Sequence, residues 1–423
     1  MPGENVEVLT TDGLNTKGLV VPRYEYADDD HVVLKLKSGY NIGLRVETIQ
    51  SISKIKESMN KEVSRAPLVR DKVDATKKRL LLVSTGGTIA SRVDYRTGAV
   101  HPALSASDLY ATVPELDKLA IVDPEVVFSI YSENMTPSDW RILSARIVEL
   151  ARSRNSDGIV VMMGTDTLAY TSAALSFSLM GFDIPVVVVG AQRSSDRPSS
   201  DAASNLRSAA LFAVESEKPG VYVAMHRNEN DENVAIHSGI RVRKNHTSRR
   251  DAFQSIDAPL VAEVNNASEI VWNKNYVESP RTSEPKYHLK ASFEKAVSLV
   301  KFHPGFDPSV LTYLAENRGI KGIILEGTGL GHVSDKTVSV VKYLVGKGVF
   351  VGMTSQCIWG HVDLNVYDTG RDLLAAGVIP LENMFAETAF SKLSWVMGNF
   401  SGTADLMLKN FVGEFDPRIL LTN

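Results

Sequence analysis

From residue 79 onward the chain repeats one pattern, in which a short apolar run is followed by a loop and a helical segment. The runs are RLLLVST, EVVFSIY, DGIVVMM, IPVVVVGA and GVYVAM, which begin at residues 79, 125, 157, 184 and 220. A strand that is covered on both faces has no polar face, so its sequence is apolar throughout. The alternation therefore predicts an α/β fold, with a sheet between layers of helices.

The best-marked helix is predicted at TPSDWRILSARIVELARSR, residues 136–154. Thr136 suits the N-cap, because its hydroxyl can accept a hydrogen bond from a free backbone N–H. Pro137 fits the first helical position, and Asp139 places a negative charge where the helix dipole favours it.

Residues 5–55 follow a different pattern, with short alternating segments separated by turns such as Asp12-Gly13. Such segments predict strands without intervening helices. A charged stretch then resembles a linker, and a polar, proline-containing stretch near residue 280 interrupts the α/β pattern. We therefore predict four parts: a small β-barrel domain at 1–56, a linker at 57–78, a larger α/β domain with the catalytic motifs at 79–280, and a smaller C-terminal α/β domain at 281–423.

Composition limits the function classes. The net charge of −4 gives no overall attraction for nucleic acid, so any such contact needs a local basic patch or a partner. The one cysteine, Cys357, cannot form an intrachain disulfide and is expected to be a small buried side chain. The N-terminus lacks a signal-peptide pattern, and the apolar runs are shorter than the roughly 20 residues of a membrane helix. A cytoplasmic protein outside the membrane is the expectation.

Ligands of open α/β sheets bind beyond the carboxyl ends of the strands, so the residues that follow the apolar runs are candidates for function. The first run leads to STGGTIAS, and the second ends in YSENMT. The third leads to GTDT, and a later segment reads RVRKNHTSRR. The candidate side chains in these segments are Thr88, Ser132, Glu133, Thr165, Asp166 and Lys244.

Each candidate also has a purely structural interpretation. The glycines before Thr88 fit a tight turn or a phosphate-binding loop. Thr165 and Asp166 fit a helix N-cap and its first-turn acid. Lys244 lies in a basic run that would usually face solvent. Ser132 and Glu133 are compatible with an ordinary loop.

Taken together, two threonines, an aspartate and a lysine provide a hydroxyl nucleophile and a base whose protonation a neighbouring charge can control. A buried lysine is able to accept a proton. The sequence has no G-x-S-x-G elbow, no G-x-x-x-x-G-K-[ST] loop and no His/Cys cluster with zinc spacing. These residues therefore favour an amide hydrolase that uses threonine.

The motifs STGGTIAS, YSENM, GTDT and RVRKNHT, in this order, resemble the four active-site motifs of the bacterial-type L-asparaginase/glutaminase family. The resemblance covers the chain from about residue 80 to its end. It implies an amidohydrolase with two α/β domains, the larger first, and active sites that are completed across a dimer interface.

The same resemblance implies a role for each residue. Thr88 would be the nucleophile, assisted by Tyr95 on a mobile flap. Lys244 would promote proton removal in a second cluster with Thr165, while Asp166 would hold the lysine and the α-ammonium of the substrate. Ser132 would bind the α-carboxylate, and Glu133 would help to hold the α-ammonium. Backbone N–H groups near Thr165 would stabilise the oxyanion.

The segment GAQRSSDRPSSDAASN and the N-terminal region are similar to the D subunits of archaeal Glu-tRNA(Gln) amidotransferases, over essentially the whole chain. This similarity implies that the chain hydrolyses glutamine and binds no cofactor itself. A separate E subunit would use ATP and Mg²⁺, make the main contacts to tRNA(Gln), and receive the ammonia. The implied assembly is a homodimer of this chain within a heterotetramer. Met163 stands where secreted asparaginases usually have histidine, and only a supporting contact is expected to differ.

Two alternatives remain open. A free-standing cytoplasmic L-asparaginase would explain the motifs but would leave the N-terminal domain without a purpose. A non-catalytic scaffold would predict damage to the catalytic set, and the set is intact. Other positions also have two interpretations each. His332 either lies near the site of a neighbouring subunit or is structural. Arg249 and Arg250 either contact nucleic acid or face solvent or a partner, and the RPSSD loop either docks a partner or lines an ammonia route.

Overall fold

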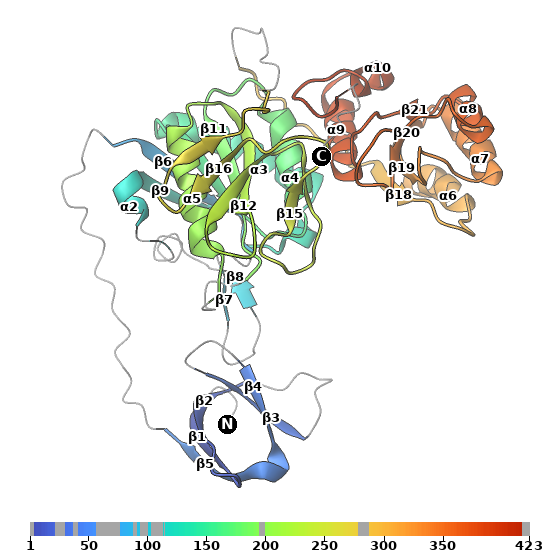
Figure 1. Cartoon of the computed structure of the whole chain (residues 1–423). Helices are drawn as coiled ribbons and strands as arrows, with labels where there is room; N and C mark the ends of the chain where they lie inside the picture. Colours follow the sequence, from blue (N-terminus) through green and yellow to red (C-terminus); the bar gives the residue numbers. More distant parts are fainter. Residues whose placement is uncertain are drawn as a thin grey trace.

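The computed structural model describes residues 4–21, 30–36, 41–55, 77–87, 91–93, 100–102, 113, 115–193, 199–277 and 287–416. Nearly all of the predicted linker at 57–78 lies outside these residues, as do Thr88 and Tyr95. The described residues form an N-terminal β-sheet, a large α/β region and a smaller C-terminal α/β region (Figure 1).

The N-terminal sheet is antiparallel and has the strand order β4-β3-β2-β1-β5. Its core consists of side chains that alternate along the strands, with Val6, Val8 and Leu34 fully buried. This alternation is the period-2 pattern of a sheet with one covered face. The strands are β1 (Asn5–Thr10), β2 (Asn15–Val20), β3 (His31–Lys35), β4 (Asn41–Arg45) and β5 (Ile49–Lys54), with a 3-10 turn at Val46–Thr48.

The central sheet has eight strands in the order β17-β16-β13-β12-β11-β10-β6-β9. The five strands from β12 to β9 are parallel, whereas β13, β16 and β17 extend the sheet with antiparallel pairs. The strands are β6 (Arg79–Ser84), β9 (Ile121–Val126), β10 (Gly158–Met162), β11 (Pro185–Val189), β12 (Gly220–His226), β13 (Asn233–Ser238), β16 (Ala262–Asn265) and β17 (Ile270–Trp272). Two hairpins lie outside this sheet: β7 (Ser91–Val93) with β8 (Val100–Pro102), and β14 (Val242–Lys244) with β15 (Phe253–Ser255).

Helices cover both faces of the central sheet, as the apolar strands require. On one face Leu80 and Leu82 pack with α2 and α5, while on the other Leu81 and Val83 pack with α3 and α4. The helices are α2 (Leu116–Leu119), α3 (Pro137–Ser153), α4 (Leu168–Ser178) and α5 (Ala202–Glu215). Together with the C-terminal α/β region, this arrangement confirms the predicted α/β fold class.

Two local predictions have different outcomes. The N-terminus of α3 is confirmed: Thr136 is the N-cap, Pro137 begins the helix, and the Asp139 carboxylate accepts the Thr136 N–H at 2.8 Å. The strand predicted at 125–131 is wrong, because β9 ends at Val126 and contains Pro124. Proline is tolerated there because, among the described strands, β9 lies at the edge of the sheet and pairs only with β6.

The C-terminal region is a parallel sheet in the order β18-β19-β20-β21. Helix α9 packs on one of its faces, while α6, α7 and α8 pack on the other. The elements are β18 (Val297–Lys301), α6 (Ser309–Arg318), β19 (Gly322–Gly327), α7 (Asp335–Gly346), β20 (Phe350–Ser355), α8 (Asp368–Ala375), β21 (Ile379–Pro380), α9 (Ala386–Asn399) and α10 (Thr403–Met407). None of the described helices combines the length and the apolar character that crossing a membrane demands.

Helix α9 also joins the C-terminal region to the larger one, because it lies beside α4 (Figure 1). The rings of Phe177 on α4 and Trp395 on α9 stack with centroids 5.3 Å apart. Ser391 Oγ donates a hydrogen bond to the backbone carbonyl of Tyr170 at 3.1 Å. The two regions therefore share a packed interface at the helix that follows the GTDT motif.

Candidate active site

The motif-bearing segments gather at the carboxyl edge of the central sheet, as the strand order requires. Strands β9, β6, β10 and β11 are neighbours, so the segments that follow them lie side by side. Backbone hydrogen bonds join the first three segments: Thr85 N–H donates to Met162 O at 2.9 Å, and Ile130 N–H donates to Thr85 O at 3.1 Å.

Glycines allow these segments to approach more closely than other residues would. A Cβ on Gly87 would lie 2.2 Å from the backbone nitrogen of Gly164, and a Cβ on Gly164 would lie 2.8 Å from Ser132 Oγ. Gly87 also has a φ of +84°, which L-residues with side chains rarely adopt. Gly87, directly before Thr88, is therefore pressed against Gly164 of the GTDT turn, and Gly164 in turn lies against Ser132.

Lys244 reaches this turn from the β14 strand. Its Nζ donates to Thr165 Oγ1 at 2.8 Å and to Asp166 Oδ1 at 2.7 Å. Thr165 and the Lys244 side chain are mostly buried, whereas 67% of the Asp166 side chain is exposed. Three of the predicted residues thus form one hydrogen-bonded cluster, with its carboxylate open to a ligand from solvent.

The structural interpretation of Thr165 and Asp166 as a helix cap is wrong. Helix α4 begins at Leu168, and its N-cap is Thr167. The hydroxyl of Thr167 donates to the backbone carbonyl of Ser132 at 2.7 Å, which ties the second motif to the third. Thr165 instead faces Lys244, so its hydroxyl belongs to the polar cluster.

The remaining predicted residues divide into two groups. Ser132 is buried and Glu133 is exposed in a 3-10 turn at Ser132–Asn134, at the same edge of the sheet. Thr88 and Tyr95 lie outside the described residues, between β6 and β7 and between β7 and β8 respectively. Met163, directly before the GTDT motif, is a buried core residue.

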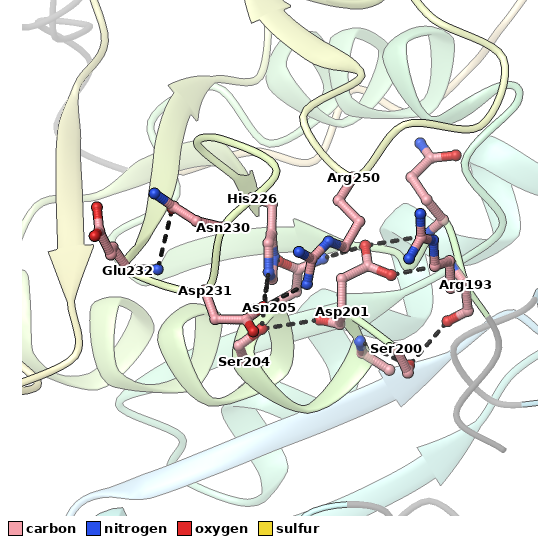
Figure 2. A network of polar contacts seen from close by, with 12 residues as sticks. Arg193, Ser200, Asp201, Ser204, Asn205, His226, Asn230, Asp231, Glu232 and Arg250 are labelled. Carbon is pink, nitrogen blue, oxygen red and sulfur yellow. Dashed lines mark hydrogen bonds and ion pairs between the residues drawn. The ribbon is translucent and has the colours of Figure 1, made fainter. Parts of the chain in front are cut away.

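A polar network around Asp201 and His226 was not anticipated from the sequence (Figure 2). Asp201, fully buried at the start of α5, accepts the backbone N–H groups of Gln192 at 3.0 Å and Arg193 at 2.9 Å. Asn205 donates to Asp201 at 3.0 Å and to the carbonyl of Gly190 at 3.1 Å. The network therefore fixes the turn that follows β11.

This turn matters to the cluster because a Cβ on Gly190 would lie 2.7 Å from Thr165 Cγ2. His226, at the end of β12, extends the network, with Nδ1 2.7 Å from Asn205 Oδ1 and Nε2 3.4 Å from Asp231 Oδ1. Burial lowers the pKa of His226, although the hydrogen bond to Asp231 acts in the opposite direction. An aspartate followed four residues later by asparagine at a helix start is a weak local signal, and nothing local marks His226.

The structure also describes Arg249, Arg250 and Cys357. Arg250 pairs with Asp231, and Arg249 pairs with Asp251 and Glu229, so both arginines have acidic partners within the chain. The expectation that Cys357 is buried is wrong, because it is exposed on the loop after β20.

His332 is held within the C-terminal region. Its Nδ1 lies 3.3 Å from Thr369 Oγ1, and its ring lies edge-on to Tyr367 with centroids 5.1 Å apart. Its role near a neighbouring subunit stays a prediction. Residues 194–198, which include Arg197 and Pro198 of the RPSSD loop, lie outside the described part of the chain, whereas the last three residues of the loop lie within it.

The arrangement has a definite chemical capacity. An ammonium group between a hydroxyl and a solvent-facing carboxylate can donate a proton, and the amine that remains can accept one from that hydroxyl. The carboxylate can also bind a cationic group of a ligand. The described cluster can therefore combine proton transfer with a binding site for a cationic group.

Three family models match the chain. The model of the N-terminal asparaginase domain matches residues 79–277, and the model of the glutaminase/asparaginase C-terminal domain matches residues 296–407. The model described as the GatD N-terminal domain matches residues 1–55.

Curated relatives match along nearly the whole chain. The D subunit of the glutamyl-tRNA(Gln) amidotransferase of Methanopyrus kandleri is 44% identical, covering 98% of this chain and 91% of the relative. The D subunit of the same enzyme from Thermofilum pendens is 45% identical, with coverages of 93% and 88%. That of Pyrococcus furiosus is 43% identical, with coverages of 97% and 93%.

Solved structures of L-asparaginases match about four fifths of the chain. The thermostable L-asparaginase from Thermococcus kodakarensis has a TM-score of 0.70 and 34% identity, and covers 80% of this chain and 99% of its own. A probable cytoplasmic L-asparaginase from Campylobacter jejuni has a TM-score of 0.66 and 27% identity, with coverages of 79% and 100%.

Proposed function

From its membership of the asparaginase family, we propose that the chain uses Thr88 to hydrolyse glutamine and supplies the ammonia to a partner subunit. Within this family the chain belongs to the branch formed by the D subunits of glutamyl-tRNA(Gln) amidotransferases. It is an asparaginase-type amidohydrolase. Its place is in a multi-subunit enzyme of tRNA-dependent amidation, as these relatives indicate.

The observation that carries the proposal is the position of Lys244 Nζ, 2.8 Å from Thr165 Oγ1 and 2.7 Å from Asp166 Oδ1. The neighbouring contact between Gly87 and Gly164 brings the segment that contains Thr88 to the same turn. Gly87, the residue before the proposed nucleophile, thus lies beside the turn that carries the proposed proton-transfer cluster, which supports acyl transfer as the reaction.

In the first chemical step, the Thr88 hydroxyl loses its proton and its oxygen bonds to the carboxamide carbon of glutamine. The carbon–nitrogen bond then breaks, the nitrogen takes up a proton, and ammonia leaves. Lys244, supported by Thr165 and Asp166, moves the proton. In the second step, water attacks the resulting ester, releases glutamate and restores the Thr88 hydroxyl.

The other predicted residues orient the substrate. Asp166, whose side chain is largely exposed, and Glu133 would bind the α-ammonium group of glutamine, and Ser132 would bind its α-carboxylate. Tyr95 would close over the substrate and assist Thr88. Backbone N–H groups near Thr165 would stabilise the oxyanion, an effect typically worth about 3–4 kcal/mol for one donor.

The partner completes the reaction. We assign the binding of tRNA(Gln), ATP and Mg²⁺ to the E subunit, which would convert Glu-tRNA(Gln) to Gln-tRNA(Gln) with the ammonia released here. The assembly would be a heterotetramer built on a homodimer of this chain, in the cytoplasm. The N-terminal sheet supports this assignment over a free-standing L-asparaginase, because residues 1–55 match the GatD N-terminal domain and the asparaginase structures cover about 80% of this chain.

Two variants test the chemistry. Thr88→Ala removes the nucleophile and Lys244→Ala removes the proton-transfer group, so each should lower ammonia release by at least about 10³-fold. Circular dichroism should show both variants folded. Turnover close to wild type in folded Thr88→Ala protein would refute the proposed mechanism.

A further inference from the structure

The segment that carries Lys244 is attached to the C-terminal region by side chains that precede the lysine. Arg243, directly before Lys244 in β14, forms an ion pair with Glu387, with Nε 2.9 Å from Oε1. Arg241 donates through both Nη atoms to Asn383 and through Nε to the carbonyl of Gly413, each at 3.1 Å. Neither arginine belongs to the predicted catalytic set.

Strand geometry explains this division. Successive side chains of a strand point to opposite faces, so Lys244 can reach Thr165 while Arg243 points to α9. Val242 lies fully buried in the core of the larger region, on the face of Lys244, whereas Arg241 lies with Arg243 toward the C-terminal region. The strand therefore connects the catalytic cluster on one face with α9 on the other.

The two segments that carry the cluster, the one before α4 and β14, both pack against α9. Helix α4, which follows Thr165 and Asp166, packs on α9 through Phe177 and Trp395. The β14 side is fixed to the first turn of α9, where Thr388 Oγ1 donates to the carbonyl of Ile240 at 3.0 Å. A shift of β14 relative to α9 would consequently change the distance between Lys244 and Thr165.

Glu387 is suited to hold this position. The residue is 9% exposed, and Glu326 and Tyr170 lie close enough to it for their charges to interact. Burial raises the pKa of Glu326, and Glu387 adds to that effect. Without the guanidinium of Arg243, Glu387 would be a buried carboxylate next to a second acidic group, which is unfavourable.

We propose that Arg243 is a positioning residue of the amide-hydrolysis site: its ion pair with Glu387 holds β14 against α9 and keeps the Lys244 ammonium group within hydrogen-bonding distance of Thr165. The inference deepens the proposed function and rests on it. It makes the packing of the C-terminal region on the larger one a determinant of the catalytic rate.

The test compares Arg243→Gln and Glu387→Gln with two reference variants in the full chain. Arg243→Lys keeps the charge, and Arg249→Gln removes a half-exposed arginine of the same segment that pairs with Glu229 and Asp251. We expect Arg243→Gln and Glu387→Gln to lower kcat for glutamine by about 10-fold to 100-fold, the range of a small misplacement, with little change in KM. Arg243→Lys should recover most of the rate, and Arg249→Gln should match wild type.

A second readout is independent of turnover. The rate at which acetic anhydride acetylates Lys244, followed by peptide mass spectrometry, reports how well its ammonium group is held. We expect several-fold faster acetylation in Arg243→Gln and an unchanged rate in Arg249→Gln. A wild-type acetylation rate in Arg243→Gln would overturn the inference, whether or not kcat falls. Absence of glutamine turnover by the wild-type chain, alone and with its partner, would instead remove the proposed function, and the acetylation rates would still decide the positioning role.

Discussion

Among the described residues, the lysine–carboxylate pairs Lys244–Asp166 and Lys392–Glu414 have the same Nζ to oxygen distance, 2.7 Å, but opposite surroundings. Lys392 and Glu414 are both fully buried. Lys392 Nζ also donates to the carbonyls of Met407 and Lys409, so three acceptors surround it. Lys244 has Thr165 and Asp166 as partners, and the Asp166 carboxylate is largely exposed.

The difference separates a structural lysine, Lys392, from Lys244, the lysine to which we assign a chemical role. The Glu414 carboxylate accepts the backbone N–H groups of Phe411 and Val412, so the buried pair closes the C-terminal segment onto α9 with its hydrogen bonds satisfied. The pair at Lys244 leaves a carboxylate open to a ligand and places a hydroxyl on the same ammonium group. The proposed chemical role of Lys244 therefore depends on the exposure of its partner carboxylate and on the nearby hydroxyl, and not on the ion pair itself.

Replacing each lysine by alanine should affect different properties: stability for Lys392 and ammonia release for Lys244. Lys392→Ala leaves the Glu414 carboxylate buried and unpaired, which should lower the free energy of unfolding by about 3–5 kcal/mol. Lys244→Ala should abolish ammonia release with little change in Tm. Thermal unfolding and ammonia release, measured on both variants, check the contrast.

A double variant controls for the loss of the buried charge. The double variant Lys392→Met with Glu414→Gln has no charge at this buried site. Its free energy of unfolding should therefore be substantially higher than that of Lys392→Ala. If Lys392→Ala were as stable as wild type, the buried pair would not have the structural role assigned here.

A buried titratable group without a carboxylate partner should behave differently from Lys392, and His237 offers this case. Burial lowers the pKa of His237 to about 3, with a smaller effect of the Arg227 charge. Because the folded-state pKa lies below the unfolded value of about 6.5, the unfolded chain binds the additional proton between these two values. The contribution of His237 is therefore complete above pH 6.5 and is lost as the pH falls toward 3.

His237→Asn should reduce the pH dependence of stability by up to one proton, which is about 1.4 kcal/mol per pH unit within that window. Asparagine keeps a polar group near Ser255, which lies 2.8 Å from His237 Nδ1 in the native chain. Denaturant unfolding from pH 7 to pH 4 measures the slope. Equal slopes in both proteins would show that His237 does not titrate on unfolding.

The smallest effect is expected at a solvent-exposed pair. Lys321 and Glu294 are also 2.7 Å apart, but 62% of the lysine side chain is exposed. Solvent screening limits such pairs to about 1 kcal/mol or less, so Lys321→Ala should change Tm only slightly. If Lys321→Ala lowered the stability as much as Lys392→Ala, burial would not determine how much these ion pairs contribute to stability.

The features that local sequence determines were predictable. The α3 start follows from Thr136, Pro137 and Asp139, which interact within one helical turn. The fully apolar strands follow from burial on both faces. The antiparallel strands β13, β16 and β17 were not predicted, and β9 was misplaced because Pro124 is acceptable only at an edge, which depends on the sheet order.

The site was predictable as a set of strand ends but not as a geometry. Thr165 and Asp166 have the local pattern of a helix cap, and Lys244, which gives them another role, lies 78 residues away from Asp166. The supporting contacts are also long-range, such as the pair of Arg243 with Glu387. No periodicity marks such pairs, because their partners meet only through tertiary packing.

The measurement that tests the central claim most directly is ammonia release from glutamine and from asparagine by the purified chain, with and without the E subunit, Glu-tRNA(Gln) and ATP. The proposed function predicts glutamine hydrolysis that is low for the chain alone and rises when the complex and Glu-tRNA(Gln) are present. Rapid asparagine hydrolysis by the chain alone, unaffected by these additions, would contradict it and would identify a free-standing asparaginase.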